Sequence, residues 1–254
     1  MKYLIIGPGG LGFFGMLGCL TNLKEELKNV EEISGSSAGS LLGFLLLTNK
    51  SLEEIFDISL NINISELTKM NLNAFIKTFG FIDHELIKQK LIEIWGGNPR
   101  FKDLSKKFHV SAYCLNTLEV EYFSIDTNPD MYVIDAICAS ISVPFMFAAF
   151  NFNGKLYIDG GANEKIPALP FLNKKREDVL CVATRTFKSE HVEINSLHSF
   201  VRQIGNSILK HSISYNLPGY FIDISDFNTL DMNMSFDDKL KMFLFGYSFK
   251  KNVK

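Results

Sequence analysis

Five consecutive residues, Gly35-Ser36-Ser37-Ala38-Gly39, have the spacing G-x-S-x-G. Glycines two residues before and two residues after a serine let a strand turn sharply into a helix, so that the serine hydroxyl stands at the amino end of that helix. Free N–H groups and the helix dipole favour negative charge there. The spacing therefore predicts nucleophilic attack by a serine, and its register selects Ser37 rather than Ser36 or Ser40.

The elements that such a turn requires are present on both sides of it. Val30–Ser34 predicts a short strand, and the apolar run Ala38–Leu47 predicts a helix. Chance alone gives this five-residue pattern in roughly one chain in ten of similar length. The prediction of a nucleophile at Ser37 therefore depends on the order strand, turn and helix, with Gly35 and Gly39 supporting the turn.

A second glycine-rich turn lies near the amino end, between a strand predicted over Lys2–Gly7 and a helix predicted over Phe14–Leu27. Its G-x-G-x-x-G spacing is also found in dinucleotide-binding turns, which need an acidic residue at the end of the second strand. Here that strand ends in the serine turn, and Glu31 and Glu32 stand at its beginning. The dinucleotide interpretation is therefore the weaker one.

The other use of such a turn is to point backbone N–H groups at an oxyanion. Acyl transfer places negative charge on a carbonyl oxygen in the transition state, and preorganised donors stabilise that charge. The two glycine-rich turns follow adjacent strands at the same sheet edge, so their helix ends can converge. We expect Gly9 and Gly10 to be the best donors, with Leu11 next.

A serine nucleophile also needs a base, and the segment Gly154–Pro167 offers one. Asp159 ends an apolar strand predicted over Lys155–Gly160 and is followed by Gly160 and Gly161. A carboxylate at a strand end, in a glycine turn, reaches the edge of a sheet where active sites lie. An Asp-Gly pair is equally typical of a simple turn or helix cap, so both interpretations stay open for this segment alone.

None of the five histidines occupies a glycine-bounded loop after a strand. Each is expected to be a surface or capping residue: His84, His109, His191, His198 and His211. A histidine base would indicate an α/β-hydrolase, but there the serine turn normally follows several strands, and here it follows one.

Together these pieces resemble the patatin-like phospholipases, over about Lys2–Pro167. That family has a glycine-rich oxyanion loop at its first strand, a G-x-S-x-G turn at its second and a later Asp-Gly-Gly. Ala136–Phe147 is similar to its Ala-Ser-x-x-x-Pro segment. The resemblance implies a three-layer α/β/α fold with a mixed, mostly parallel sheet, which we expect to form one domain over residues 1–254.

The resemblance also implies the chemistry. Ser37 and Asp159 would form a catalytic dyad without histidine, and the substrate would be a phospholipid, lysophospholipid or neutral acylglycerol. No metal and no cofactor is implied. A non-catalytic lipid- or protein-binding relative remains an alternative, and hydrolysis of p-nitrophenyl esters separates it from an enzyme.

The first glycine loop departs from the family pattern, Gly-Gly-Gly-x-Arg/Lys-Gly. Aligned without gaps, the pattern falls on Pro8 to Phe13, so that Gly12 stands at the basic position and Phe13 at the last glycine. An alignment with a deletion places the last glycine at Gly12 instead, and the basic residue is missing in both. The family's asparagine after Asp-Gly-Gly is Lys165 here. The nucleophile, the base and the backbone donors are all retained.

Composition excludes several other classes. The net charge is −2, which gives no overall basic excess for binding nucleic acid, and 46% of the 254 residues are apolar, which argues against disorder. No signal peptide or membrane span is expected, and the location expected is the cytoplasm. All four cysteines lie in apolar runs and are expected to be reduced core residues: Cys19, Cys114, Cys138 and Cys181.

The carboxyl-terminal stretch Ser235–Lys254 predicts a helix capped by Ser235. Large apolar residues alternate there with lysines, which are Lys239, Lys241, Lys250, Lys251 and Lys254. The first interpretation is a helix that packs on the sheet with the lysines as its solvated rim. The second is a basic aromatic helix that binds an anionic membrane surface, and we expect weak peripheral binding of this kind.

The remaining elements follow from periodicity and capping residues. Ser51 and Glu54 form a capping-box pattern, and Asp83–Gly96 predicts a helix. Further strands are expected at Val110–Asn116, Glu119–Ile125 and Val179–Arg185, and helices throughout the carboxyl-terminal quarter.

Overall fold

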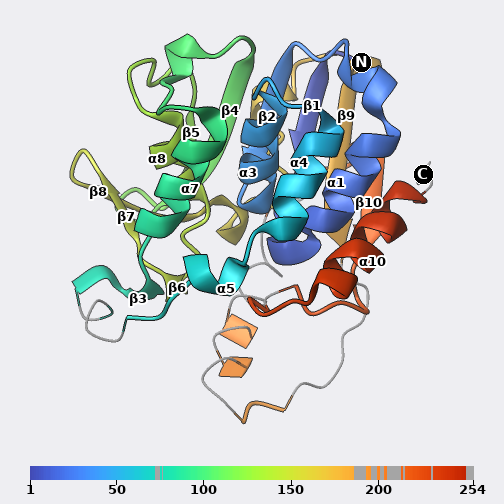
Figure 1. Ribbon diagram of the computed structural model, residues 1–254. Coiled ribbons are helices and arrows are strands. Elements are labelled where there is room, and N and C mark those ends of the chain that lie inside the picture. Colours follow the sequence, from blue (N-terminus) through green and yellow to red (C-terminus); the bar gives the residue numbers. More distant parts are fainter. Residues whose placement is uncertain are drawn as a thin grey trace.

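The computed structural model contains an eight-stranded mixed sheet with helices packed against it (Figure 1). The strand order is β10-β9-β1-β2-β4-β8-β7, and β5 pairs with β4. The residues that the structure describes are 1–71, 75, 77–185, 193–195, 199–200, 203–204, 213, 215–229 and 231–249.

The strands pair in parallel from β10 to β4 and antiparallel beyond. Parallel pairing joins β10 with β9, β9 with β1, β1 with β2 and β2 with β4. Antiparallel pairing joins β4 with β5, β4 with β8 and β7 with β8. The bounds are β1 Tyr3–Ile6, β2 Glu32–Ser36, β4 Lys107–Cys114, β5 Glu119–Phe123, β7 Phe150–Phe152, β8 Lys155–Asp159, β9 Val179–Arg185 and β10 Gly219–Asp223.

Alternation along the buried strands divides the core between the two faces of the sheet. Leu4 and Ile6 of β1 belong to the larger cluster, whereas Ile5 between them belongs to a second cluster on the other face. The larger cluster is covered by helices α1 (Phe13–Asn22), α3 (Ala38–Leu46), α7 (Glu85–Trp95) and α8 (Val133–Ser140). All four cysteines are buried and free, as expected.

On the other face, the described residues that cover the sheet include the 3₁₀ turn Leu169–Phe171 and Tyr215. The mixed, mostly parallel sheet with its helices confirms the expected fold class. The remaining short elements are α2 Lys24–Leu27, α4 Leu52–Asn61 and α5 Ile64–Leu67, together with a two-stranded sheet of β3 (Gly80–Ile82) and β6 (Phe145–Phe147).

Local sequence signals place several boundaries correctly. The Ser51–Glu54 capping box is formed at the start of α4, and Gly96 adopts a left-handed conformation at the end of α7. The predicted helix over Phe14–Leu27 is instead interrupted at Leu23. An all-helical carboxyl-terminal quarter is wrong, because Gly219–Asp223 forms edge strand β10, held by parallel pairing with β9.

Helix α10 (Phe236–Tyr247) begins at the predicted cap Ser235 and packs on α1 rather than directly on the sheet (Figure 1). Lys239 is buried, so the expectation that the lysines of this helix are solvated is wrong for this residue. Its ammonium group donates to the carbonyl oxygens of Leu60 and Ile62 at 3.2 and 2.7 Å, at the carboxyl end of α4. Lys250, Lys251 and Lys254 lie outside the described residues.

Two strands meet end to end along β4. Strand β2 pairs with the first part of β4 and ends at Ser36, opposite Ser111. Strand β8 runs the opposite way along the same side of β4 and ends at Asp159, opposite Ala112. Because Ser111 and Ala112 are consecutive, the carboxyl ends of β2 and β8 face each other, and the residues that follow them are brought together.

Candidate active site

Ser37 lies between the last residue of β2 and the first residue of α3, in a backbone conformation that non-glycine residues rarely adopt. Its φ is 52° and its ψ is −125°. Such strain persists only where the surrounding structure holds it, and it is concentrated at functional sites. The order strand, turn and helix that the sequence predicts around Ser37 is therefore present, with the serine at the amino end of α3.

The glycines on each side of Ser37 are required by space. A Cβ at Gly35 would lie 2.6 Å from the carbonyl oxygen of Gly39, and a Cβ at Gly39 would lie 2.2 Å from that of Ile6. Both distances are too short for any side chain. The two glycines let α3 start directly against the ends of β2 and β1.

Two further serines hold the turn in place. The N–H of Ser37 donates to Ser140 Oγ at 2.8 Å, and Ser40 Oγ donates to the carbonyl oxygen of Ser37 at 2.6 Å. The strained residue is thus anchored through both of its backbone groups. Sequence reasoning missed Ser140, although it is the serine of the Ala-Ser-x-x-x-Pro segment and could have been found there.

Asp159 is buried, with 7% of its surface exposed. Its Oδ1 accepts the N–H of Gly161 at 2.7 Å, so the residue also makes the simple turn that the sequence allowed. Its Oδ2 has no hydrogen bond of normal length within the described residues. Burial raises the pKa of Asp159 to about 6, although interactions with the Ser37 side chain and the Gly161 N–H lower it in part.

The Ser37 hydroxyl is therefore close enough to lower the pKa of the Asp159 carboxyl group, although no hydrogen bond of normal geometry joins the two side chains. Catalytic hydrogen bonds are often loose without substrate and tighten in the complex. Because a pKa near 6 is closer to neutral pH than the ordinary value for aspartate, the buried carboxylate is a better proton acceptor than an exposed one.

The two glycines after Asp159 pack tightly against neighbouring elements. A Cβ at Gly160 would lie 2.4 Å from the carbonyl oxygen of Ser111 on β4, and a Cβ at Gly161 would lie 3.1 Å from the ring of Pro8. The Asp-Gly-Gly turn thus touches the first glycine loop. Ser37, Asp159 and this loop form one site at the carboxyl ends of β1 and β2.

Within the first loop, the three expected donors differ. No described group accepts the N–H of Gly9 or of Gly10, whereas the N–H of Leu11 donates to the carbonyl oxygen of Thr229 at 2.8 Å. The expectation that Leu11 is a further oxyanion donor is therefore wrong, because its N–H already donates to Thr229. Gly10 has a φ of 53°, which favours glycine, and the N–H of Gly12 closes the turn on the Gly9 oxygen at 2.8 Å.

The expectation that each histidine is a surface or capping residue is met by His84, the N-cap residue of α7, and is wrong for His109, which lies within β4. His84 and His109 are both buried. The Nε2 of His84 lies 3.1 Å from Ser142 Oγ, and that of His109 lies 3.1 Å from a Glu32 carboxylate oxygen. Neither ring is hydrogen-bonded to Ser37 or Asp159. His191, His198 and His211 lie outside the described residues.

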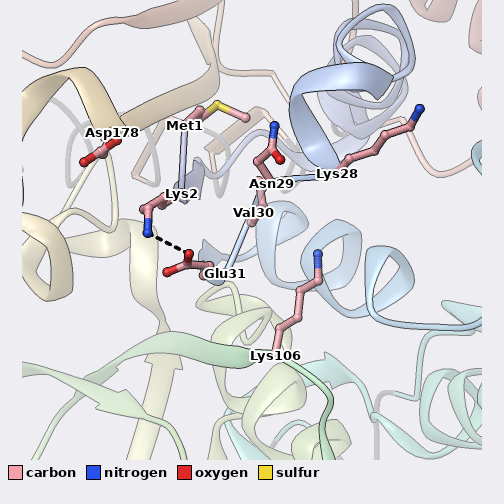
Figure 2. Close-up of a pocket in the computed structure, with 8 residues that line it drawn as sticks. All are labelled: Met1, Lys2, Lys28, Asn29, Val30, Glu31, Lys106 and Asp178. Carbon is pink, nitrogen blue, oxygen red and sulfur yellow. Dashed lines mark hydrogen bonds and ion pairs between the residues drawn. The ribbon is translucent and has the colours of Figure 1, made fainter.

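A depression of about 490 Å³ lies at the amino ends of the parallel strands, opposite the end where Ser37 lies (Figure 2). Its walls come from residues that precede strands β1, β2, β4 and β9, including Lys2, Glu31, Lys106 and Asp178. Lys2 and Glu31 neutralise each other in an ion pair of 2.8 Å. This depression contains no serine, cysteine or histidine, so it is not where the predicted chemistry takes place.

The family model of the patatin-like phospholipases matches residues 4–172 of this chain. The chain belongs to the patatin-like phospholipase family. The match includes the first glycine loop, the serine turn at Ser37 and the Asp-Gly-Gly at Asp159, in the order in which the structure brings them together.

Two curated relatives of this family member come from viruses. The chain is 26% identical over 217 residues to the probable lipid hydrolase 463L of Invertebrate iridescent virus 6, covering 78% of the chain and 75% of that protein. It is 24% identical over 280 residues to the uncharacterized protein R571 of Acanthamoeba polyphaga mimivirus, covering 98% of the chain and 92% of that protein.

Among solved structures, the chain resembles VipD from Legionella pneumophila. The TM-score is 0.61 at 16% identity, and the superposition covers 97% of this chain and 65% of VipD. At this identity the likeness supports the fold alone. The chain spans about two thirds of the length of this neighbour.

Proposed function

We propose that this patatin-like protein is a lipid acyl hydrolase in which Ser37 is the nucleophile and Asp159 the base. The observation that carries the proposal is the meeting of β2 and β8 end to end on β4. It sets a strained serine at the amino end of a helix beside a buried carboxylate. The family and the probable lipid hydrolase among the relatives support a fatty acyl ester of a lipid as substrate.

In the first half of the proposed reaction, Ser37 Oγ attacks the acyl carbonyl carbon while Asp159 takes the hydroxyl proton. The N–H groups of Gly9 and Gly10 receive the negative charge that forms on the carbonyl oxygen. The bond to the alcohol then breaks, and the alcohol oxygen takes the proton back from Asp159. The product of this half is an acyl ester on Ser37.

In the second half, a water molecule attacks the acyl ester and gives a proton to Asp159. The bond to Ser37 Oγ breaks, the serine regains its proton, and the fatty acid leaves. The Ser37 N–H takes no part in binding the oxyanion, because it is donated to Ser140. Its role is to keep the nucleophile in the strained turn.

The rate of hydrolysis should depend on pH through Asp159. Only the ionised carboxylate accepts a proton, and burial raises its pKa to about 6. For a soluble p-nitrophenyl ester, kcat/KM should therefore rise about tenfold per pH unit below 6 and level off above pH 7. The measurement is a rate profile between pH 4.5 and 8.5, with stability monitored at each pH.

A profile that is flat through this range would remove Asp159 as the base. If the folded protein hydrolyses no ester at any of several acyl chain lengths, the chain would instead be a non-catalytic lipid- or protein-binding relative.

An enzyme that acts on bilayer lipids must contact their surface, and exposed aromatic residues lie near the candidate site. Phe79 and Phe145 are 60% and 40% exposed, and both have a positive φ. They are neighbours, because Gly80 of β3 pairs with Phe145 of β6. Phe145 is also joined closely to the site, since Ser140 binds the Ser37 N–H and the N–H of Asp159 donates to the Ser142 carbonyl oxygen.

We propose that these two phenylalanines form an apolar lip that enters the lipid interface. Within the described ranges, the structure has no helix long and apolar enough to cross a membrane. Contact through such a lip matches the peripheral binding expected from the sequence but uses the active-site edge. It is independent of the lysines at the end of the chain.

Replacing both Phe79 and Phe145 by serine should reduce hydrolysis of phospholipid vesicles about tenfold or more. Hydrolysis of a soluble short-chain ester should change less than threefold, because the dyad is untouched. Each exposed apolar side chain that enters the interface contributes roughly 1–2 kcal/mol to binding. The measurements are vesicle flotation and both hydrolysis rates.

Ile125→Ser is the matched control, since Ile125 is 39% exposed but follows β5, which runs antiparallel to β4 and ends at Phe123 opposite Val110, so that Ile125 lies toward the amino end of β4. Equal loss of vesicle binding in the control and in the double variant would contradict the lip.

A further inference from the structure

The first glycine loop is held by a residue that lies beyond the part of the chain matched by the family model, which ends at residue 172. We propose that Thr184 is a positioning residue that fixes the orientation of the peptide group between Pro8 and Gly9. It would thereby aim the Gly9 N–H at the oxyanion. This inference rests on the proposed function, in which Gly9 is one of the oxyanion donors.

The contact that carries the inference is a hydrogen bond from Thr184 Oγ1 to the carbonyl oxygen of Pro8, 3.0 Å long. A peptide group is planar and trans, so its carbonyl oxygen and its N–H point in opposite directions. The oxygen of Pro8 and the N–H of Gly9 belong to the same peptide group. Holding the oxygen on the Thr184 side therefore directs the N–H of Gly9 away from Thr184.

The loop needs such a restraint because little else fixes this peptide. Its orientation is set by ψ of Pro8 and φ of Gly9, and glycine accepts nearly any φ. No described group accepts the Gly9 N–H, so the peptide has no second internal anchor. Gly10 and Gly12, the other glycines that follow in this loop, have no side chains that could hold it.

Thr184 is also rigidly placed. It lies on β9, opposite Ile222 of β10, and a β-branched side chain has restricted rotation about its first torsion. A Cβ at Gly9 would lie 2.6 Å from Thr184 Oγ1, and a Cβ at Gly12 would lie 2.8 Å from Thr184 Cγ2. The threonine side chain thus fills the space next to both glycines and packs directly against the loop.

The hydrogen bond has an electronic consequence as well. Donation to the carbonyl oxygen of a peptide polarises the group and makes its N–H a stronger donor. Thr184 would therefore improve both the direction and the strength of the Gly9 donor. Since the charge on the substrate oxygen is largest in the transition state, the effect should appear in kcat rather than in KM.

The test compares Thr184→Val, which keeps the shape but loses the hydroxyl, with Thr184→Ser, which keeps the hydroxyl. With a soluble p-nitrophenyl ester, kcat of the valine variant should fall about 10- to 100-fold with KM within about threefold. The serine variant should retain kcat within about threefold. Thr184→Ala, which also lacks the hydroxyl, serves in place of valine if that variant does not fold.

A second readout does not depend on activity. The ¹⁵N chemical shift of the Gly9 amide should move in the valine and alanine variants and stay near the original value in the serine variant. Wild-type kcat in the valine or alanine variant, or equal losses in all three, would overturn the role of Thr184. An active Ser37→Ala variant would instead overturn the proposed function, so the two failures are distinguishable.

Discussion

Ser37→Ala should reduce ester hydrolysis by about 10⁴-fold or more while the protein stays folded. The substitution removes only the hydroxyl, and the Ser37 N–H would still donate to Ser140 Oγ. The strained turn is therefore kept, but no nucleophile remains. The measurements are p-nitrophenyl ester hydrolysis, labelling by a fluorophosphonate probe and circular dichroism.

The adjacent serine provides a matched control. Ser36 Oγ is buried and has no hydrogen-bond partner within the described residues, so Ser36→Ala removes a polar atom that nothing uses. This variant should keep its activity within about threefold and gain slightly in stability. Retained turnover in Ser37→Ala, or loss of labelling in Ser36→Ala alone, would move the nucleophile away from Ser37.

Asp159→Asn should be nearly as damaging to catalysis, lowering kcat about 10³-fold or more, because an amide cannot take the serine proton. The same change should stabilise the protein at neutral pH. Burial raises the pKa of Asp159 from 3.8 to about 6, so the folded state holds the ionised carboxylate at a cost. Asparagine has the same shape and still accepts the Gly161 N–H through its oxygen.

The sign of the stability effect depends on pH. A carboxyl group whose pKa is raised in the folded state favours folding when it is protonated, below about pH 3.8, and this advantage is lost as the pH rises through about 6. The asparagine variant should therefore be more stable than the natural protein by about 1–3 kcal/mol at pH 8 and show little difference at pH 4. Chemical denaturation at both pH values measures this.

Histidine variants complete the comparison. Single replacement of His84 or His109 by alanine should leave the chemistry in place, because neither ring is hydrogen-bonded to Ser37 or Asp159 in the structure. The same outcome is expected for His191, His198 and His211. A folded histidine variant without activity, together with an active Asp159→Asn, would indicate a triad hydrolase.

The local parts of the site follow from the sequence by itself. The turn at Ser37 is encoded within five residues, because positions 35 and 39 have no room for a Cβ and therefore accept only glycine. The strand that ends at Asp159 and the tight turn after it are equally local. These features depend on short-range sterics, which residue types at fixed spacing determine.

The tertiary structure decided what these parts do to one another. Only the pairing of β2 and β8 along the same side of β4 brings Asp159 beside Ser37, although they are 122 positions apart in sequence. Burial of His84 and His109, the use of the Leu11 N–H by Thr229 and the edge position of β10 also depend on distant partners. Spacing along a chain carries no information about such partners.

Ser140 and Thr184 show the same division. Ser140 stands in the Ala-Ser-x-x-x-Pro segment and nothing in its immediate sequence marks Thr184, but in neither case does the sequence name the partner. Ser140 accepts the N–H of the proposed nucleophile, and Thr184 donates to the peptide of a proposed oxyanion donor. Each comes from an element far along the chain, packed against a turn near the amino end. The residues for the chemistry are local in the sequence, and the groups that hold them in position are not, because a buried backbone group takes whichever partner the packed fold brings to it.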